Sequence, residues 1–278
     1  MKIEDDKMYL IGEASKICKI SKKTLRYYSD TGVVLPDKID EETGYRYYSK
    51  ETLLNVPVLK YYKQMGFKLN EMKDVISGDT KSRIREKLAD KSRELESLRE
   101  ELDNSYKATR EWHELIKEAQ YVVDHQVDKP SYKYLNEKKY CYLEQKFNYN
   151  YMESIINIEW VEHLEKHDNE ISGAVILMFD SYLDKMNGES DYVKIMQTPL
   201  KPCKGLLKKH TMSSGLYANI YHIGPHKNID ESYKKLHNWI NNKGYRPLGR
   251  SYERYLVDYW TTRNSNEFVT EILIPIHK

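Results

Sequence analysis

Two glutamates near the C-terminal end of the chain lie in patterns that could bind a small organic molecule. In a predicted strand from Ser251 to Tyr259, alternation places Glu253 on the same face as Tyr255, Val257 and Tyr259. A carboxylate among aromatic side chains is costly to bury without a partner, and burial raises its pKa. An organic cation would supply the missing charge, and each ring adds roughly 0.5–2 kcal/mol by cation–π contact. Glu253 therefore predicts a pocket for a lipophilic, cationic molecule.

Further residues extend this candidate site. Glu271 alternates with Val269 and Leu273 on the last predicted strand and is a second candidate carboxylate. The full ligand-binding hypothesis comprises Glu253, Tyr255, Phe268, Glu271, Tyr217 and Tyr233. Alternatives stay open, because Glu253 could pair with Arg250 or Arg254 or face solvent, and the tyrosines could be ordinary core residues.

A second group of residues could bind nucleic acid. Between Ala14 and Tyr28 the chain carries five basic residues and no acidic one. Cations of this kind neutralise phosphates, and a helix can present them in the major groove. The DNA-contact hypothesis comprises Lys22, Lys23 and Thr24 in the first turn of a helix, then Arg26, Tyr27 and Tyr28, with Tyr45 and Arg46 on a hairpin.

Short elements with clear boundaries must position these basic residues. Residues 11–18 and 22–30 read as two helices joined by a short turn, with Ser21 as the N-cap of the second and Gly32 as its stop. Thr43-Gly44 predicts a turn before a β-prone segment. A third helix from 50 to 65 and a fourth before Gly78 complete a winged helix-turn-helix domain, residues 1–78.

Residues 79–122 predict one long helix. Apolar positions recur alternately every four and three residues, which is the pattern of a coiled coil. The predicted seam comprises Ile84, Leu88, Lys91, Leu95, Leu98, Leu102, Ser105, Thr109, Trp112 and Ile116. Such a helix cannot bury its seam alone, so we expect a homodimer through the coiled coil, with packing on its own domain as the alternative.

Residues 123–278 predict a duplicated α/β domain. Each half reads as a strand, a helix (152–166 and 230–242) and two further strands, and Trp160 and Trp239 occupy similar places in the two helices. Such units commonly pair about a pseudo-twofold axis. The predicted fold class is therefore multidomain α+β, with a winged helix-turn-helix head, a long coiled-coil helix and a duplicated ligand-binding domain.

Composition excludes several other classes of protein. The 278 residues have a net charge of +2, and no apolar run is long enough for a membrane span or a signal peptide, so we expect a cytoplasmic protein. Cys18, Cys141 and Cys203 are isolated, which predicts inert packing or surface residues and no disulfide or metal site. We expect no cofactor.

Two segments carry a resemblance to known families. The DNA-binding domain of the MerR family resembles the segment YLIGEASKICKISKKTLRYYSDTGVVLPDKIDEETGYRYYS. Pro57, in the third helix after this segment, is a departure from the family. GLYANIYHIGPHKNIDESYKKLHNWINNKGYRPLGRSYERYLVDYW resembles the GyrI-like effector-binding domain of multidrug-sensing regulators. The resemblance implies a dimeric activator that distorts promoter DNA for RNA polymerase when an effector binds. It also implies that Arg26, Tyr27, Tyr28 and Arg46 contact DNA and that Glu253 lies at the base of the pocket.

Two other functions remain as alternatives. Some stand-alone GyrI-like domains resemble hydrolases, and Glu253 with a tyrosine could act as a general base and acid on a reactive small molecule. A constitutive repressor with a vestigial sensor is the third hypothesis. The first hypothesis predicts ligand-dependent transcription, the second predicts ligand turnover, and the third predicts neither.

Overall fold

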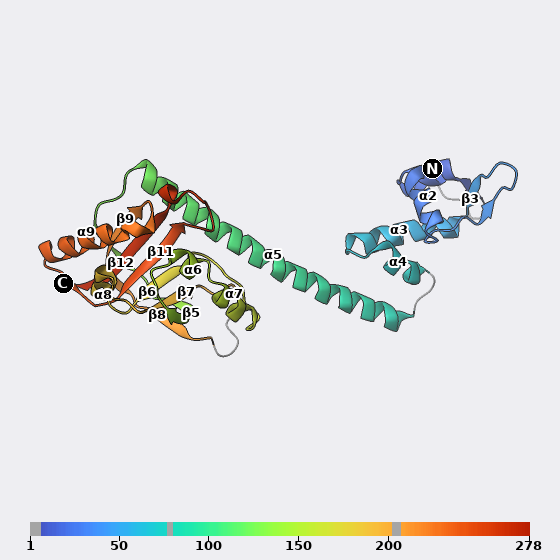
Figure 1. The fold of residues 1–278 in the computed structure, drawn as a ribbon. Helices are drawn as coiled ribbons and strands as arrows, with labels where there is room; N and C mark the ends of the chain where they lie inside the picture. Colours follow the sequence, from blue (N-terminus) through green and yellow to red (C-terminus); the bar gives the residue numbers. More distant parts are fainter. Residues whose placement is uncertain (1–6, 77–79, 202–206) are drawn as a thin grey trace. The chain divides into compact units, whose positions relative to one another are not determined.

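The computed structural model describes residues 7–76, 80–201 and 207–278, and they form two compact units, residues 1–100 and 101–278 (Figure 1). Among the described residues, no helix combines the length and the apolar character needed to cross a bilayer. Cys18 and Cys141 are buried packing residues, whereas the prediction for Cys203 lies outside the described residues.

The first unit is a winged helix-turn-helix. Helices α1 (Ile11–Cys18) and α2 (Lys22–Asp30) have the predicted bounds, and the Ser21 hydroxyl caps α2 by accepting from the Thr24 amide at 3.0 Å. Strands β1 (Tyr9–Leu10), β2 (Lys38–Ile39) and β3 (Arg46–Tyr48) form a small antiparallel sheet. Helices α3 (Lys50–Gln64), which continues through Pro57, and α4 (Leu69–Ile76) complete the unit.

Helix α5 (Lys81–Asp124) has 44 residues and contributes to both units. Part of the predicted seam is exposed, and Leu98 and Leu102 keep 50% and 70% of their surface. Lys91 differs from the prediction, because its ammonium lies 5.2 Å from the Phe67 ring centre and 3.5 Å from a Glu71 oxygen. It therefore packs on the head and does not lie in a free seam.

The second unit is built on a nine-stranded antiparallel sheet in the order β4-β9-β12-β11-β6-β7-β5-β8, with β10 beside β12. The strands are β4 (Ser131–Leu135), β5 (Lys138–Lys146), β6 (Ile176–Phe179), β7 (Tyr192–Gln197), β8 (Lys209–Met212), β9 (Gly215–Ile223), β10 (Arg246–Pro247), β11 (Ser251–Val257) and β12 (Val269–His277).

The strand order shows the duplication. In each half the first strand lies farthest from the centre, the last lies next to it, and the middle strand meets its counterpart at the centre, so β9-β12-β11 mirrors β5-β7-β6, with β4 and β8 added at the two edges. The two middle strands, β6 and β11, pair directly, with Glu253 opposite Leu177. Glu253 consequently lies at the junction of the two halves.

The shorter helices of this unit cover one face of the sheet, called the helix-covered face, and α9 (Ile229–Asn242) runs along β9 (Figure 1), whereas α5 packs on the opposite face. The predicted first-half helix 152–166 is wrong as a single element. It divides into α6 (Tyr151–Ile155) and α7 (Ile158–Glu165), because the Asn157 side chain accepts from the Trp160 amide at 2.7 Å and starts a new helix. An additional short helix, α8 (Tyr182–Asn187), follows β6.

Candidate effector-binding site

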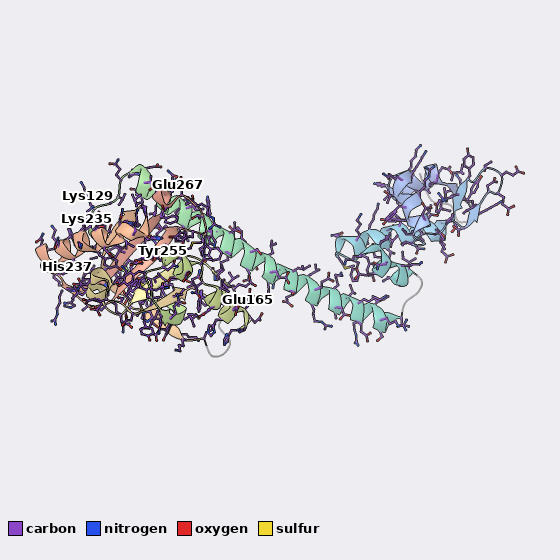
Figure 2. All side chains as sticks on the ribbon, viewed as in Figure 1. Lys129, Glu165, Lys235, His237, Tyr255 and Glu267 are labelled. Carbon is purple, nitrogen blue, oxygen red and sulfur yellow. The ribbon has the colours of Figure 1, made fainter. Side chains whose placement is uncertain are left out.

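Glu253 lies on the helix-covered face of the sheet and is fully buried, with 0% exposed surface. On β11 it lies between Leu177 of β6 and Ile272 of β12, its partners on the two neighbouring strands. Both partners belong to the core between the sheet and its helices. The predicted alternation is confirmed for Tyr255, whose hydroxyl donates to Glu253 Oε2 at 2.5 Å. Tyr255 itself lies within the dense side-chain packing of the second unit (Figure 2).

A lysine provides the charge partner of Glu253. The Lys185 Nζ lies 3.8 Å from Glu253 Oε1, and the Tyr233 hydroxyl donates to that same oxygen at 3.0 Å. Burial raises the pKa of Glu253 above its usual range, while Lys185 and the hydrogen bonds from Tyr255 and Tyr233 oppose that rise. The structure does not show the open alternatives, in which Glu253 pairs with Arg250 or Arg254 or faces solvent.

Helix α8 carries Lys185, and neither the helix nor the lysine was predicted from the sequence. Ser181 caps the helix by accepting from the Asp184 amide, and Gly188 ends it with φ of 78°. These two signals could have located the helix. The burial of Lys185 has no local signal, because lysine is almost never fully buried unless it is paired, and its partners are remote in sequence.

An outer cavity of about 620 Å³ adjoins this buried group. Its lining includes Tyr149, Tyr151, His226, Asp230 and Tyr259. Among the described residues, Tyr151 Oη and His226 Nδ1 are buried without a hydrogen-bond partner. Burial lowers the pKa of His226 to about 3, so its ring is neutral near pH 7.

Phe268 supports this cavity from behind. Its ring stacks on His226 with 5.0 Å between ring centres and meets the Tyr259 ring edge-on at 4.7 Å. Phe268 was predicted to wall the pocket, but its ring is buried behind His226 and does not line the cavity. It contributes packing that fixes the imidazole.

Two predicted ligand residues, Glu271 and Tyr217, lie on the opposite face of the sheet from Glu253. Glu271 accepts from Arg254 Nε at 2.8 Å, and it also pairs with Lys133. The Tyr217 hydroxyl donates to the Ser213 carbonyl at 2.8 Å, and burial raises its pKa to about 12. These two residues and Glu253 cannot contact one ligand, because the sheet separates them.

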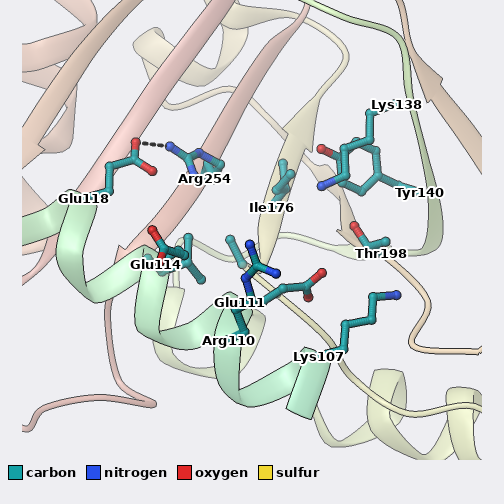
Figure 3. Close-up of a pocket in the computed structure, with 13 residues that line it drawn as sticks. Lys107, Arg110, Glu111, Glu114, Glu118, Lys138, Tyr140, Ile176, Thr198 and Arg254 are labelled. Carbon is teal, nitrogen blue, oxygen red and sulfur yellow. Dashed lines mark hydrogen bonds and ion pairs between the residues drawn. The ribbon is translucent and has the colours of Figure 1, made fainter. Parts of the chain in front are cut away.

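A second cavity, of about 430 Å³, occupies this other face, between α5 and the sheet (Figure 3). Lys107, Arg110 and Glu111 on α5 face Lys138 and Tyr140 across it. The cavity carries both signs of charge, and at its edge Arg254 of β11 forms an ion pair with Glu118 of α5, drawn as a dashed line in Figure 3.

The predicted DNA-contact residues of the head are mostly exposed. Lys22, Lys23 and Arg26 face solvent, and the Tyr27 ring keeps 57% of its surface. The Thr24 hydroxyl lies 2.8 Å from that of Ser21 and helps to cap the helix.

The remaining predicted contacts of the head divide into two kinds. Tyr45 is exposed on the wing, and Arg46 forms an ion pair with Asp30 at 3.0 Å. Tyr28 is the exception, since it is 7% exposed and belongs to the core of the head. Its DNA contact stays a prediction, since most of the side chain packs in the core while the residue also lines a surface cavity beside Lys23 and Tyr27.

Comparisons with known proteins agree with these two units. The family model of the GyrI-like small molecule binding domain matches residues 128–277, and that of the MerR HTH family regulatory protein matches residues 9–79. The "Multidrug-efflux transporter 2 regulator" of Bacillus subtilis is 28% identical over 98% of each chain. The "Multidrug-efflux transporter 1 regulator" of the same organism is 42% identical over 65 residues, 23% of each chain.

A solved structure, the cryo-EM structure of an EcmrR–DNA complex in EcmrR-RPo, covers 97% of this chain and 100% of its own, with 21% identity and a TM-score of 0.46. Of the two matching family models, the GyrI-like one spans more than half of the sequence. The chain therefore belongs to the family of the GyrI-like small molecule binding domain, and its helix-turn-helix head matches the model of the MerR HTH family regulatory protein.

Proposed function

We propose that the protein is a ligand-responsive transcription regulator, which binds promoter DNA as a dimer and activates transcription when a small lipophilic effector occupies the cavity beside Glu253. The observation that carries this proposal is the buried Glu253 with its two tyrosine hydroxyls, inside a small-molecule binding domain joined to a DNA-binding head. The proposal places the protein in the cytoplasm, where promoter DNA and RNA polymerase are its partners.

The head supports the DNA-binding part of the proposal. Lys22, Lys23 and Arg26 are exposed on α2, the second helix of the helix-turn-helix, where the major groove is usually read. Exposed Leu98 and Leu102 support dimerisation, because an apolar stripe on a helix is stabilised by a second helix. Two-fold symmetric binding to two half-sites would follow.

The test begins with the full chain and a random library of duplex DNA, from which bound sequences are selected. The recovered site is placed in the spacer of a promoter, and run-off transcription is measured with RNA polymerase and a panel of lipophilic compounds. We expect transcription to rise with a compound that binds the chain. Failure to select any duplex, or an identical transcript level with every bound compound, would contradict the proposal.

Hydrolysis of a small molecule is the second candidate function. The short Tyr255–Glu253 contact of 2.5 Å favours it, since a carboxylate beside a hydroxyl can act as base and acid. The full burial of Glu253 opposes it, because a general base must reach the proton that it removes. Chromatography of each bound compound after incubation separates the two candidates, since a regulator returns it unchanged.

A further inference from the structure

The ammonium group of Lys185 is buried in a setting that is typical of a bound ligand. Its side chain has 0% exposed surface, and Nζ lies 3.1 Å from Asp230 Oδ1 and 3.8 Å from Glu253 Oε1. Asp230 is half-exposed at the outer cavity, whereas Glu253 is fully buried. The lysine thus bridges the base of the site and its outer cavity.

Aromatic rings enclose the same ammonium. Its Nζ lies 5.1 to 5.7 Å from four ring centres, within the distance at which a cation is attracted to a ring face. The four rings are those of Tyr149, Tyr151, Phe179 and Tyr233. Rings around a carboxylate form the kind of cage that an organic cation would require, and here the chain supplies the cation itself.

This arrangement already satisfies Glu253. One of its oxygens accepts from Tyr233 and faces the ammonium, and the other accepts from Tyr255. A second monovalent cation in the cage would be repelled by the ammonium, or would have to displace it into a site with fewer partners. The occupied cage therefore discriminates against monovalent organic cations.

The outer cavity offers different chemistry. It has about 620 Å³ of space, and aromatic walls are provided by Tyr149, Tyr151 and Tyr259. Tyr151 Oη and the neutral His226 Nδ1 are both buried and lack hydrogen-bond partners among the described residues. Such groups fit an uncharged aromatic molecule with a hydrogen-bonding atom.

We propose that Lys185 is a built-in occupant of the cation position, so that the outer cavity takes uncharged aromatic effectors in preference to monovalent organic cations. This inference rests on the proposed function, since it names the ligand class and the selectivity determinant of the same site. It differs from the prediction from the sequence, in which an organic cation from solution is the charge partner of Glu253.

The test compares two probes of similar shape and different charge, methyltriphenylphosphonium and triphenylphosphine oxide, by calorimetric titration of the full chain. Wild type is expected to bind the neutral oxide at least as tightly as the phosphonium. Lys185→Met vacates the cage and should raise the affinity for the phosphonium about tenfold or more, with the affinity for the oxide changed less than about threefold. The double variant Lys185→Met/Glu253→Gln should lose this gain.

Lys234→Met is the matched control, because Lys234 is exposed on α9 and does not line the outer cavity. It removes the same charge and should leave the preference unchanged. The inference is overturned if wild type prefers the phosphonium about tenfold or more, a result that does not depend on whether Lys185→Met folds. It is also overturned if folded Lys185→Met gains nothing.

The outcomes separate this inference from the proposed function. If wild type binds the oxide, Lys185→Met gains the phosphonium and no bound compound alters transcription, the proposed function fails and the inference stands. If a bound phosphonium activates transcription in wild type through Glu253, the proposed function stands and the inference fails.

Discussion

At the scale of single residues, the site depends on a buried charge pair with hydrogen bonds to both oxygens of the carboxylate. Burying an ion pair seldom adds much stability, yet removing one partner leaves an uncompensated buried charge. Lys185 keeps its contact with Asp230, so the loss of Glu253 removes part of its compensation. The pair is therefore expected to specify what the cavity binds more than to stabilise the fold.

Glu253→Gln should lower the free energy of unfolding by roughly 3 kcal/mol at pH 7, because the ammonium of Lys185 stays buried with one carboxylate. Urea denaturation followed by circular dichroism measures the loss. Lys185→Met/Glu253→Gln should recover a large part of it, since both charges are removed. Exposed Glu189→Gln, near Lys185 in the chain, should change the stability by less than about 0.5 kcal/mol. An equal loss in the single and the double variant would refute this account.

His226 predicts a pH dependence of stability. Burial lowers the pKa of the folded state to about 3, below the usual value of 6.5 that the unfolded chain has, so only the unfolded chain takes up a proton as pH falls through 6.5. This contribution is full above pH 6.5 and is lost towards pH 3. Wild type should lose about 2 kcal/mol relative to His226→Gln between pH 7 and pH 5. Parallel slopes for the two proteins across that range would contradict the assignment.

At the scale of elements, strand β11 joins the two faces of the domain. Glu253 faces the helix-covered side, and its neighbour Arg254 faces α5, where it forms ion pairs with Glu118 and Glu271. Burial raises the pKa of Glu118, but the attraction of Arg254 and the hydrogen bonds from Arg254 and Tyr221 together outweigh burial and hold the pKa below its usual range. A displacement of β11 at the effector site would thus act on an ion pair of the long helix.

Glu118→Gln should leave compound affinity within about twofold of wild type and lower the effector-driven rise in transcription about fivefold, because it weakens the link between β11 and α5. Titration and run-off transcription on the same preparation measure both quantities. Glu114→Gln, on the same helix and paired with Lys117 one turn away, is the control. An unchanged transcriptional response in Glu118→Gln would show that the Arg254–Glu118 ion pair does not transmit the effect of ligand binding to α5.

At the scale of the whole molecule, α5 should hold two chains together. Leu95, Leu98 and Leu102 are exposed in the single chain, whereas Leu115, Ala119 and Val122, further along the helix, pack on Leu256 and Val269. Of the last two predicted seam residues, Trp112 packs on its own domain, whereas Ile116 stays exposed. The dimer contact that we propose lies in the first two-thirds of the helix.

Leu98→Asp should weaken dimerisation roughly a hundredfold or more, because each dimer loses two buried leucines and gains two charges in an apolar contact. Sedimentation equilibrium measures the dissociation constant, and binding to the selected DNA should weaken with it. Ser97→Asp adds the same charge beside the seam and should leave the dimer intact. Equal masses for Leu98→Asp and wild type at all concentrations would place the dimer contact elsewhere.

Local signals in the sequence were enough to determine several elements. Ser21 caps α2, and Gly32 follows its end with φ of 71°, so both predicted boundaries of that helix are confirmed. Alternation along β11 correctly placed Glu253 and Tyr255 on one face, but it was wrong for Val257, which packs toward α5 because the strand register shifts after Tyr255. The duplication was also visible, since each half repeats one order of helix and strands.

Only the tertiary structure decided what surrounds Glu253. Alternation relates residues of one strand but does not say which face of the sheet a second strand presents, so Glu271 and Tyr217 were grouped wrongly with Glu253. Lys185 comes from a helix in the other half of the domain, and it reaches Glu253 because β6 and β11 pair at the centre of the sheet. A charge partner that is remote in sequence leaves no periodic pattern, so folding alone brought it to the site.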